Sequence, residues 1–590
     1  MAQLLSNNFI RISDYYSDAF CDLLSFYGFQ RTVFESTRGG IVSRYLRMRP
    51  SKNSLKMNYK NSPRRYYKRV NELKSEESRI DLSSFLKPND VVHCKTEGSV
   101  IAEFFKGKSV FITGGTGFLG KLIIEKLTRS CKDIDKIYIL IREKKNKDFI
   151  RRTEELLNGM VFSEVKKVQP DFQRKIIPLR GDISLPNLGL NEADQETIKN
   201  EVHVIFHVAA TVKLDEKLCR SVKINIEATI DLVNLAKTCK NLMSLVYVST
   251  AYSNSIREVI EEKIYEPTVT DFQILKMTQS QRDISDEEEK RILGEWKNSY
   301  VMTKNIAEHV IKTHGSDLPV CIFRPAIVTN TFKEPLKGYV DNYYGTIGVL
   351  ANNYAGVLRT ANVDGEVLIE NVPADFVVNG IIVAAYKNHI LGRGDIRIYN
   401  YVSSEENPIK TRDLHDLAAF YGHQTPTIKS LWYPCNTINS NFYVHAIFTI
   451  FLHFVPAFFF DLYLTLMGKK PWMMSFYKKI YRFNKSIAWF ASNEWKFSTN
   501  NVQQLWNELP YVDKRIFPFS MSKENFNWNE YLSQVNLGIR LYLLQDELHT
   551  MTNAIRKHKN QYYLHIGVKY GVASAMFLSS AIFFGRIWGL

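Results

Sequence analysis

The chain has 590 residues, which is too long for a single hydrophobic core, so two or three domains are expected. Hydrophobic residues make up 45% of the chain and charged residues 23%, and this composition excludes a largely disordered protein. The seven cysteines form no CxxC pair, which favours reduced thiols and argues against a structural metal site.

The formal net charge is +16, and about half of this excess lies in the first hundred residues. Residues 1–97 form a basic N-terminal extension with little apolar periodicity, and we expect it to be mobile. Its apolar stretch 19–29 is interrupted by Asp22 and is too short for the core of a signal peptide. Because no recognisable nucleic-acid-binding fold accompanies the basic residues, we expect no nucleic acid; an anionic membrane surface or a polyanionic cofactor accounts for the charge.

The glycine-rich segment 108–126 has the order of a site that binds a dinucleotide. The apolar run 110–112 predicts a short strand, and a helical spacing of apolar residues follows the glycines. Such glycines permit a tight turn, let the backbone approach a pyrophosphate and let the helix pack closely on the strand. The alternative is a glycine-rich turn without a ligand. The residues expected to contact the cofactor here are Thr113, Gly114, Thr116, Gly117, Phe118, Leu119 and Gly120.

From about residue 98, predicted strands alternate with predicted helices, which indicates an α/β fold with a Rossmann-type doubly wound parallel sheet. The second strand, 137–141, ends at Arg142. An acid near this position suits NADH, whereas arginine suits the 2′-phosphate of NADPH. Lys144 and Lys145 reinforce the preference for NADPH, although a solvated basic loop is the alternative.

Three further strands are predicted at 175–179, 202–206 and 242–248, with helices over 195–199 and 221–239. The first of these strands leads to Asp182, which we expect near the adenine. The second is followed by small residues including Ala209, which would let the chain pass beneath the nicotinamide ring. The third ends in Ser249 and Thr250.

Tyr300 and Lys304 are four residues apart on a predicted helix that runs to about residue 313, so they project from one face. Reduction of a carbonyl by hydride leaves charge on oxygen, which must receive a proton. We expect Tyr300 to supply it, with its pKa lowered by the ammonium of Lys304, which would also hold the cofactor ribose. A hydroxyl at the end of the strand 242–248 would hydrogen-bond the same carbonyl oxygen.

The segments ITGGTGFLG (112–120), IREK (141–144), VSTAY (248–252) and SYVMTK (299–304) resemble the extended short-chain dehydrogenase/reductases. More narrowly, FRPAIV (323–328), NVPADFVVN (371–379) and NEWKFSTNNVQQLW (493–506) resemble the fatty acyl-CoA reductases. The resemblance covers roughly residues 98–545. It implies a catalytic domain over 98–400 and a smaller, mainly helical domain over 401–550.

The same resemblance implies NADPH-dependent reduction of a long-chain fatty acyl-CoA to a primary alcohol, with release of coenzyme A. It assigns catalysis to Thr250 with Ser249, Tyr300 and Lys304. It also implies that Arg142 binds the 2′-phosphate of NADPH. The implied reaction has two hydride transfers, of which the first gives an aldehyde and a thiolate and the second the alcohol.

Two apolar segments predict contact with a membrane. Residues 566–584 are nearly all apolar or small, and we expect a C-terminal transmembrane anchor over 562–590. The basic residues Arg556, Lys557 and Lys559 precede it, which would leave the catalytic domain facing the cytosol on an intracellular membrane such as the endoplasmic reticulum, a peroxisome or a lipid droplet. A buried amphipathic helix is the alternative.

The second apolar segment, 442–467, contains His445, His453, Pro456 and Asp461. Ionisable groups are costly inside a bilayer, so an interfacial or re-entrant segment, or the wall of an acyl-chain tunnel, is preferred to a full span. The two histidines are interpreted as satisfied polar groups and not as metal ligands.

Two other functions fit parts of the pattern: a membrane-bound reductase acting on a sterol or another lipid carbonyl, and a cofactor-binding scaffold without catalysis. The second would be expected to lose Tyr300 or Lys304, and the sequence retains both.

Overall fold

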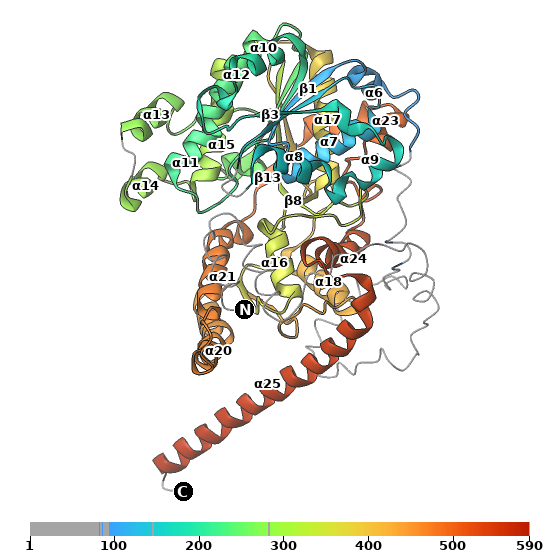
Figure 1. Ribbon diagram of the computed structural model, residues 1–590. Coiled ribbons are helices and arrows are strands. Elements are labelled where there is room, and N and C mark those ends of the chain that lie inside the picture. Colours follow the sequence, from blue (N-terminus) through green and yellow to red (C-terminus); the bar gives the residue numbers. More distant parts are fainter. Residues whose placement is uncertain are drawn as a thin grey trace.

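The computed structural model describes residues 94–143, 147–280 and 284–588, together with the single residues 82, 85 and 92. Nearly all of the N-terminal extension therefore lies outside the described residues, as do Lys144 and Lys145. Figure 1 shows a sheet covered by helices on both faces, a mainly helical region beside it, and one long helix that projects away from the body.

The central sheet has seven parallel strands in the order β11-β7-β5-β4-β1-β2-β3. The strands are β1 Ser109–Thr113, β2 Ile137–Ile141, β3 Ile176–Arg180, β4 Val202–His207, β5 Ser244–Val248, β7 Val320–Pro325 and β11 Arg397–Tyr401. Strands β2 and β3 are added on one side of β1, and β4 is added on its other side. The carboxyl ends of the neighbouring strands β1 and β4 therefore form the crevice where such sheets bind ligands. The predicted doubly wound parallel sheet is confirmed.

Alternating side chains of each strand enter two different cores. In β1, Val110 and Ile112 belong to one buried cluster and Phe111 belongs to the other, on the opposite face. Because both faces are covered, the strands are continuously apolar. One face is covered by α7 Phe118–Ser130 and α17 Ala374–Leu391, and the other by α10 Glu192–Glu201, α12 Ala228–Thr238 and α15 Ser299–His314.

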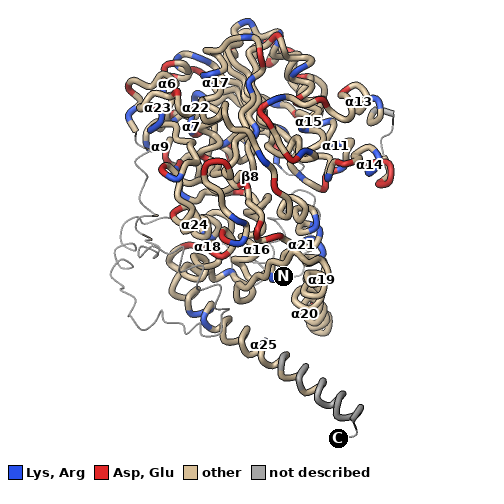
Figure 2. The backbone as a smooth tube through the Cα atoms, turned by 180° about the vertical axis from the view of Figure 1, so that it is seen from behind, with Lys and Arg blue, Asp and Glu red and all other residues tan. Residues whose placement is uncertain are grey.

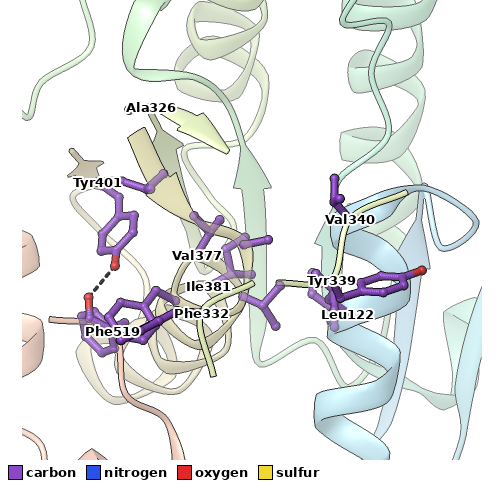
Figure 3. Close-up of a cluster of buried hydrophobic side chains, with 14 of the residues drawn as sticks. Leu122, Ala326, Phe332, Tyr339, Val340, Val377, Ile381, Tyr401 and Phe519 are labelled. Carbon is purple, nitrogen blue, oxygen red and sulfur yellow. Dashed lines mark hydrogen bonds between the residues drawn. The ribbon is translucent and has the colours of Figure 1, made fainter. Parts of the chain in front are cut away.

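The larger core joins the sheet to the C-terminal part of the chain. Figure 3 shows Val377 and Ile381 of α17 among side chains from several elements, with the Tyr401 hydroxyl donating a hydrogen bond to the carbonyl of Phe519. The helical region contains α16 Gly345–Tyr354, α18 Thr411–Gln424, α21 Met473–Ala488 and α24 Trp528–Gly538. The short parallel pair of β6 Val259–Ile260 with β13 Lys496–Phe497 connects this C-terminal part to the sheet region. Two more short parallel pairs lie outside the central sheet: β8 Ile327–Thr329 with β10 Asn371–Pro373, and β9 Thr360–Asn362 with β12 Thr437–Asn439.

The apolar segment 442–467 is a helix formed by α19 Phe442–Thr449, a π-helical turn Ile450–Phe454 and α20 Val455–Leu466. Among the described residues, it is the helix with the length and composition to cross a membrane, and 22% of its most apolar window is buried. Its Asp461 carboxylate accepts hydrogen bonds from the first backbone amides of α21, at 2.8–2.9 Å. The carboxylate therefore caps the next helix.

The two histidines of this segment are satisfied within the protein, as expected. His453 Nε2 accepts a hydrogen bond from the backbone N–H of Arg359 at 3.0 Å, and His445 Nδ1 lies 3.2 Å from the Thr360 hydroxyl. Within the described part of the chain, no group of three or more potential ligands is placed to hold a metal ion.

The predicted C-terminal anchor lies in α25 Met551–Trp588, the helix that projects from the body in Figure 1. Its first turns contact the helical region, where Gln561 Nε2 donates to the Ser430 carbonyl at 3.2 Å. Farther along, Leu564, Val568 and Val572 are exposed. Insertion of this helix into a bilayer stays a prediction.

Candidate active site

The glycine turn connects β1 to α7 at the carboxyl edge of the sheet. Gly114 has φ +77°, and a Cβ built on it would lie 2.7 Å from the backbone nitrogen of Ala209. A Cβ on Gly120 would lie 2.2 Å from the Gly114 carbonyl oxygen. The turn therefore requires glycine at both positions.

The start of α7 is open to a ligand. Its N-cap is Gly117, which offers no side chain to bind the first backbone amides. A helix N-terminus of this kind attracts phosphate through its N–H groups and its dipole. The turn residues Gly114, Thr116, Gly117, Phe118, Leu119 and Gly120 line a cavity of about 900 Å³. The observed geometry fits the pyrophosphate of a dinucleotide.

Thr113 and Ala209 lie beside the glycine turn, at the ends of β1 and β4, and are linked by hydrogen bonds. The Thr113 hydroxyl lies 2.6 Å from His207 Nδ1, and the Ala209 N–H donates to the same hydroxyl at 3.4 Å. Burial, and then the charge of Lys304, lower the pKa of His207 to about 3. This histidine is therefore a neutral hydrogen-bonding group beneath the turn.

Arg142 and Asp182 lie together at the ends of β2 and β3. Arg142 Nε is 3.8 Å from Asp182 Oδ2, and the Arg142 side chain is 41% exposed. Asp182 Oδ1 accepts hydrogen bonds from the backbone N–H and the hydroxyl of Ser184 at 2.9 and 2.8 Å. Arg152, which the sequence reasoning missed, donates to the Thr116 hydroxyl at 3.1 Å and to the Arg142 carbonyl. It ties the glycine turn to the end of β2.

Tyr300 lies in the first turn of α15, whose N-cap Asn298 accepts a hydrogen bond from the Val301 N–H at 3.0 Å. Its hydroxyl is hydrogen-bonded to the Thr250 side chain. Both residues line the cavity together with the glycine turn. Burial raises the pKa of Tyr300 to about 12, against the lowering effect of the hydrogen bond with Thr250. The phenol therefore keeps its proton at neutral pH.

Lys304 also lines the cavity, but its ammonium turns toward the sheet. Nζ donates a hydrogen bond to the Val248 carbonyl at 2.7 Å and lies 4.1 Å from the centre of the Tyr247 ring. Burial lowers the pKa of Lys304 to about 7, although the charge of Glu308 acts to raise it. The expectation that Lys304 lowers the pKa of Tyr300 is wrong here, because burial raises that pKa.

Ser249 is held in a buried ionic network. Its hydroxyl donates to Glu308 Oε1 at 2.5 Å, and Ser253 donates to the same oxygen at 2.8 Å. Glu308 forms an ion pair with Arg324 at 2.7 Å, and both side chains are at most 1% exposed. The hydroxyl of Ser249 therefore binds Glu308 and not Tyr300, whereas the side chain of Thr250 interacts with the Tyr300 hydroxyl.

Sequence reasoning missed Glu308 and Arg324 as parts of the site. Glu308 continues the spacing of Tyr300 and Lys304 by four residues along α15, so the helical period could have indicated it. Arg324 comes from β7, and no local pattern signals its pairing.

The cavity continues from the catalytic face into the helical region. An aromatic contact joins the two parts: the ring of Tyr252 lies 5.5 Å from Phe490 and 5.3 Å from Trp495, both edge-on. None of the residues that line this cavity comes from 442–467. A role of that segment as the wall of an acyl-chain tunnel stays a prediction. The apolar side chains that line this part are Val349, Leu350, Ala361, Val363, Val367, Leu368, Ile369, Leu414, Ile438, Phe483 and Ile487.

Residues 112–381 match the NAD-binding domain model described as male sterility protein, and residues 452–546 match a second model of the same description. The chain is 36% identical over 512 residues to "Fatty acyl-CoA reductase wat" of Drosophila melanogaster, covering 86% of this chain and 96% of that protein. It is 34% identical over 464 residues to human "Fatty acyl-CoA reductase 1", covering 78% and 89%. A reductase domain of a nonribosomal peptide synthetase from Mycobacterium tuberculosis is similar with a TM-score of 0.49 and 18% identity, covering 79% and 97%. The chain belongs to the fatty acyl-CoA reductase family.

Proposed function

We propose that this protein reduces a long-chain fatty acyl-CoA to a primary fatty alcohol with NADPH, releasing coenzyme A. The observation that carries the proposal is the continuity of the cavity. The same cavity is lined by the glycine turn, by the Tyr300–Thr250 pair and by an apolar wall from the helical region. A nucleotide, a reacting carbonyl and an acyl chain can therefore occupy one space.

The glycine turn and the N-terminus of α7 would bind the pyrophosphate, and Arg142 would bind the 2′-phosphate that distinguishes NADPH from NADH. The adenine would lie near Asp182. When bound, the reduced nicotinamide supplies the hydride. Lys304, one turn beyond Tyr300, would hold the ribose.

The side chains of Thr250 and Tyr300 act on the carbonyl oxygen. As negative charge develops on this oxygen, the Thr250 hydroxyl would donate a hydrogen bond to it. Tyr300 would then transfer its proton, which its raised pKa keeps available at neutral pH. In the first round the oxygen belongs to the thioester, and collapse of the adduct expels the coenzyme A thiolate. In the second round it belongs to the aldehyde and becomes the alcohol.

We also propose that the protein acts at a lipid surface of an intracellular membrane. Exposed apolar side chains lie along the helix formed by α19, the π-helical turn and α20, among them Phe451, Phe458, Phe459 and Leu462. Apolar patches of this kind on a helix suit the interface of a bilayer or lipid droplet. The segment 562–590 would add an anchor, with the catalytic domain facing the cytosol.

The test uses the full chain purified in detergent with NADPH and palmitoyl-CoA. The expected products are hexadecanol and free coenzyme A. Tyr300→Phe is expected to lower product formation by about 100- to 10,000-fold, the range for loss of a general acid. Tyr511→Phe is the matched control, because Tyr511 is 75% exposed and does not line the cavity. Full activity of Tyr300→Phe would remove the proposed acid. If palmitoyl-CoA gives no hexadecanol but an added ketosteroid is reduced, the result would favour the related lipid reductase.

A further inference from the structure

We propose that the phosphates of coenzyme A bind to Arg482 and Lys479 on α21. This inference rests on the proposed function and adds the site of the substrate's charged end. Coenzyme A carries its diphosphate and 3′-phosphate at the far end of the pantetheine arm. A protein that reduces the thioester therefore needs a basic site in the same cavity, well away from the reacting carbonyl.

An aromatic contact just beyond the C-terminal end of α21 places this helix beside the candidate site. Phe490 packs against Tyr252, which is two residues beyond the catalytic Thr250. Arg482 precedes Phe490 by eight residues, which corresponds to about 12 Å along a helix that rises about 1.5 Å per residue. Lys479 lies one turn farther on the same face. Both basic residues line the cavity that holds Tyr300 and Thr250.

The charge around these residues favours an anion. No carboxylate of the described residues forms an ion pair with Arg482, and its side chain is exposed at the cavity rim. Three of the carboxylates that line the cavity are bound elsewhere: Asp341 pairs with Lys121, Glu370 accepts two backbone N–H groups, and Glu494 accepts the Leu368 N–H. Figure 2 shows basic residues along α21. Guanidinium and ammonium groups at one rim are a phosphate-binding arrangement.

The experiment compares two thioesters that share an acyl chain. Palmitoyl-CoA carries the phosphates, and the palmitoyl thioester of N-acetylcysteamine lacks them. Arg482→Glu is expected to raise the KM for palmitoyl-CoA about tenfold or more, because a charge-assisted hydrogen bond is lost. The KM for the truncated thioester and the kcat for both substrates are expected to stay within about twofold of wild type. The matched control is Lys485→Glu, which changes an exposed residue of the same helix that does not line the cavity.

A second readout needs no turnover. Calorimetric titration of the purified full chain in detergent with free coenzyme A is expected to give a Kd at least about tenfold weaker for Arg482→Glu than for wild type or Lys485→Glu. An equal rise in KM for both thioesters would overturn the inference and indicate damage to the acyl site. An equal effect of Arg482→Glu and Lys485→Glu would also overturn it, and would indicate attraction of α21 to anionic lipid or detergent. If the wild type reduces neither thioester, the proposed function itself fails.

Discussion

Replacement of Lys304 by methionine is expected to make the protein more stable and inactive. The Lys304 side chain is 2% exposed, and burial lowers its pKa from 10.5 to about 7. At 1.36 kcal/mol for each pKa unit, holding the charged form in this place costs up to about 5 kcal/mol. Lys304→Met keeps most of the side-chain volume and loses one hydrogen bond, worth about 1 kcal/mol, to the Val248 carbonyl. We expect the free energy of unfolding to rise by about 2 to 4 kcal/mol near neutral pH.

The pH dependence separates this cause from a general packing effect. Because the folded pKa of about 7 lies below the unfolded value of 10.5, the unfolded chain binds more protons between these pH values. The wild type therefore gains stability as the pH rises through this window, while the methionine variant has no corresponding titration. The advantage of Lys304→Met is expected to be full below pH 7 and to shrink toward pH 10.

Thermal unfolding without nucleotide, measured at several pH values from about 6.5 to 9.5, tests this expectation. Lys312→Met is the control, since the Lys312 side chain is 47% exposed on the same helix. The product assay with palmitoyl-CoA is expected to show loss of activity in Lys304→Met alone. A variant less stable than the wild type at pH 6.5, or a stability difference that does not change with pH, would refute the reasoning.

Three further predictions concern the nucleotide and the membrane. Gly120→Ala places a Cβ about 2.2 Å from a carbonyl oxygen of the turn, so we expect it to abolish NADPH binding, measured by NADPH fluorescence. The control Gly567→Ala, whose Cβ has no atom within 4 Å, should bind NADPH like the wild type. Arg142→Asp is expected to lower the ratio of kcat/KM for NADPH over NADH by about tenfold or more, and an unchanged ratio would remove its assigned role. Deletion of 562–590 is expected to weaken flotation with vesicles, and Phe459→Asp in the deleted chain should release the remainder. Undiminished flotation after both changes would contradict the proposed lipid contacts.

The strands were predictable from sequence where the sheet is covered on both faces. Residues 137–141 are all buried in β2, and their continuous apolar run predicted both ends of the strand. The strand predicted at 175–179 is instead Ile176–Arg180, because the exposed Arg180 extends the ladder without any apolar signal. The helix predicted at 221–239 starts at Leu218 and contains a π-helical turn over Lys223–Glu227. Apolar periodicity cannot indicate such a turn, which inserts one residue into the helical repeat.

The placement of Tyr300 beside Thr250 was predictable for a different reason. Tyr300 and Thr250 are placed by a helix start and by a strand end, which are local features of the sequence. The direction of the Lys304 ammonium depends on a carbonyl of β5, and the place of Ser249 depends on Glu308 and Arg324, from two other elements. Side-chain partners that lie more than fifty residues apart carry no periodic signal.

The network beneath the site explains why Lys304 titrates near neutral pH although a carboxylate lies one turn away. Both carboxylate oxygens of Glu308 accept hydrogen bonds from the guanidinium of Arg324, and Oε1 also accepts from the hydroxyls of Ser249 and Ser253. The positive charge of Arg324 therefore compensates most of the negative charge of Glu308. The remaining attraction raises the pKa of Lys304 less than burial lowers it. One face of α15 thus carries a phenol that keeps its proton and an ammonium that can release one. That pairing suits a site where an oxygen must be protonated repeatedly and its acid restored between rounds.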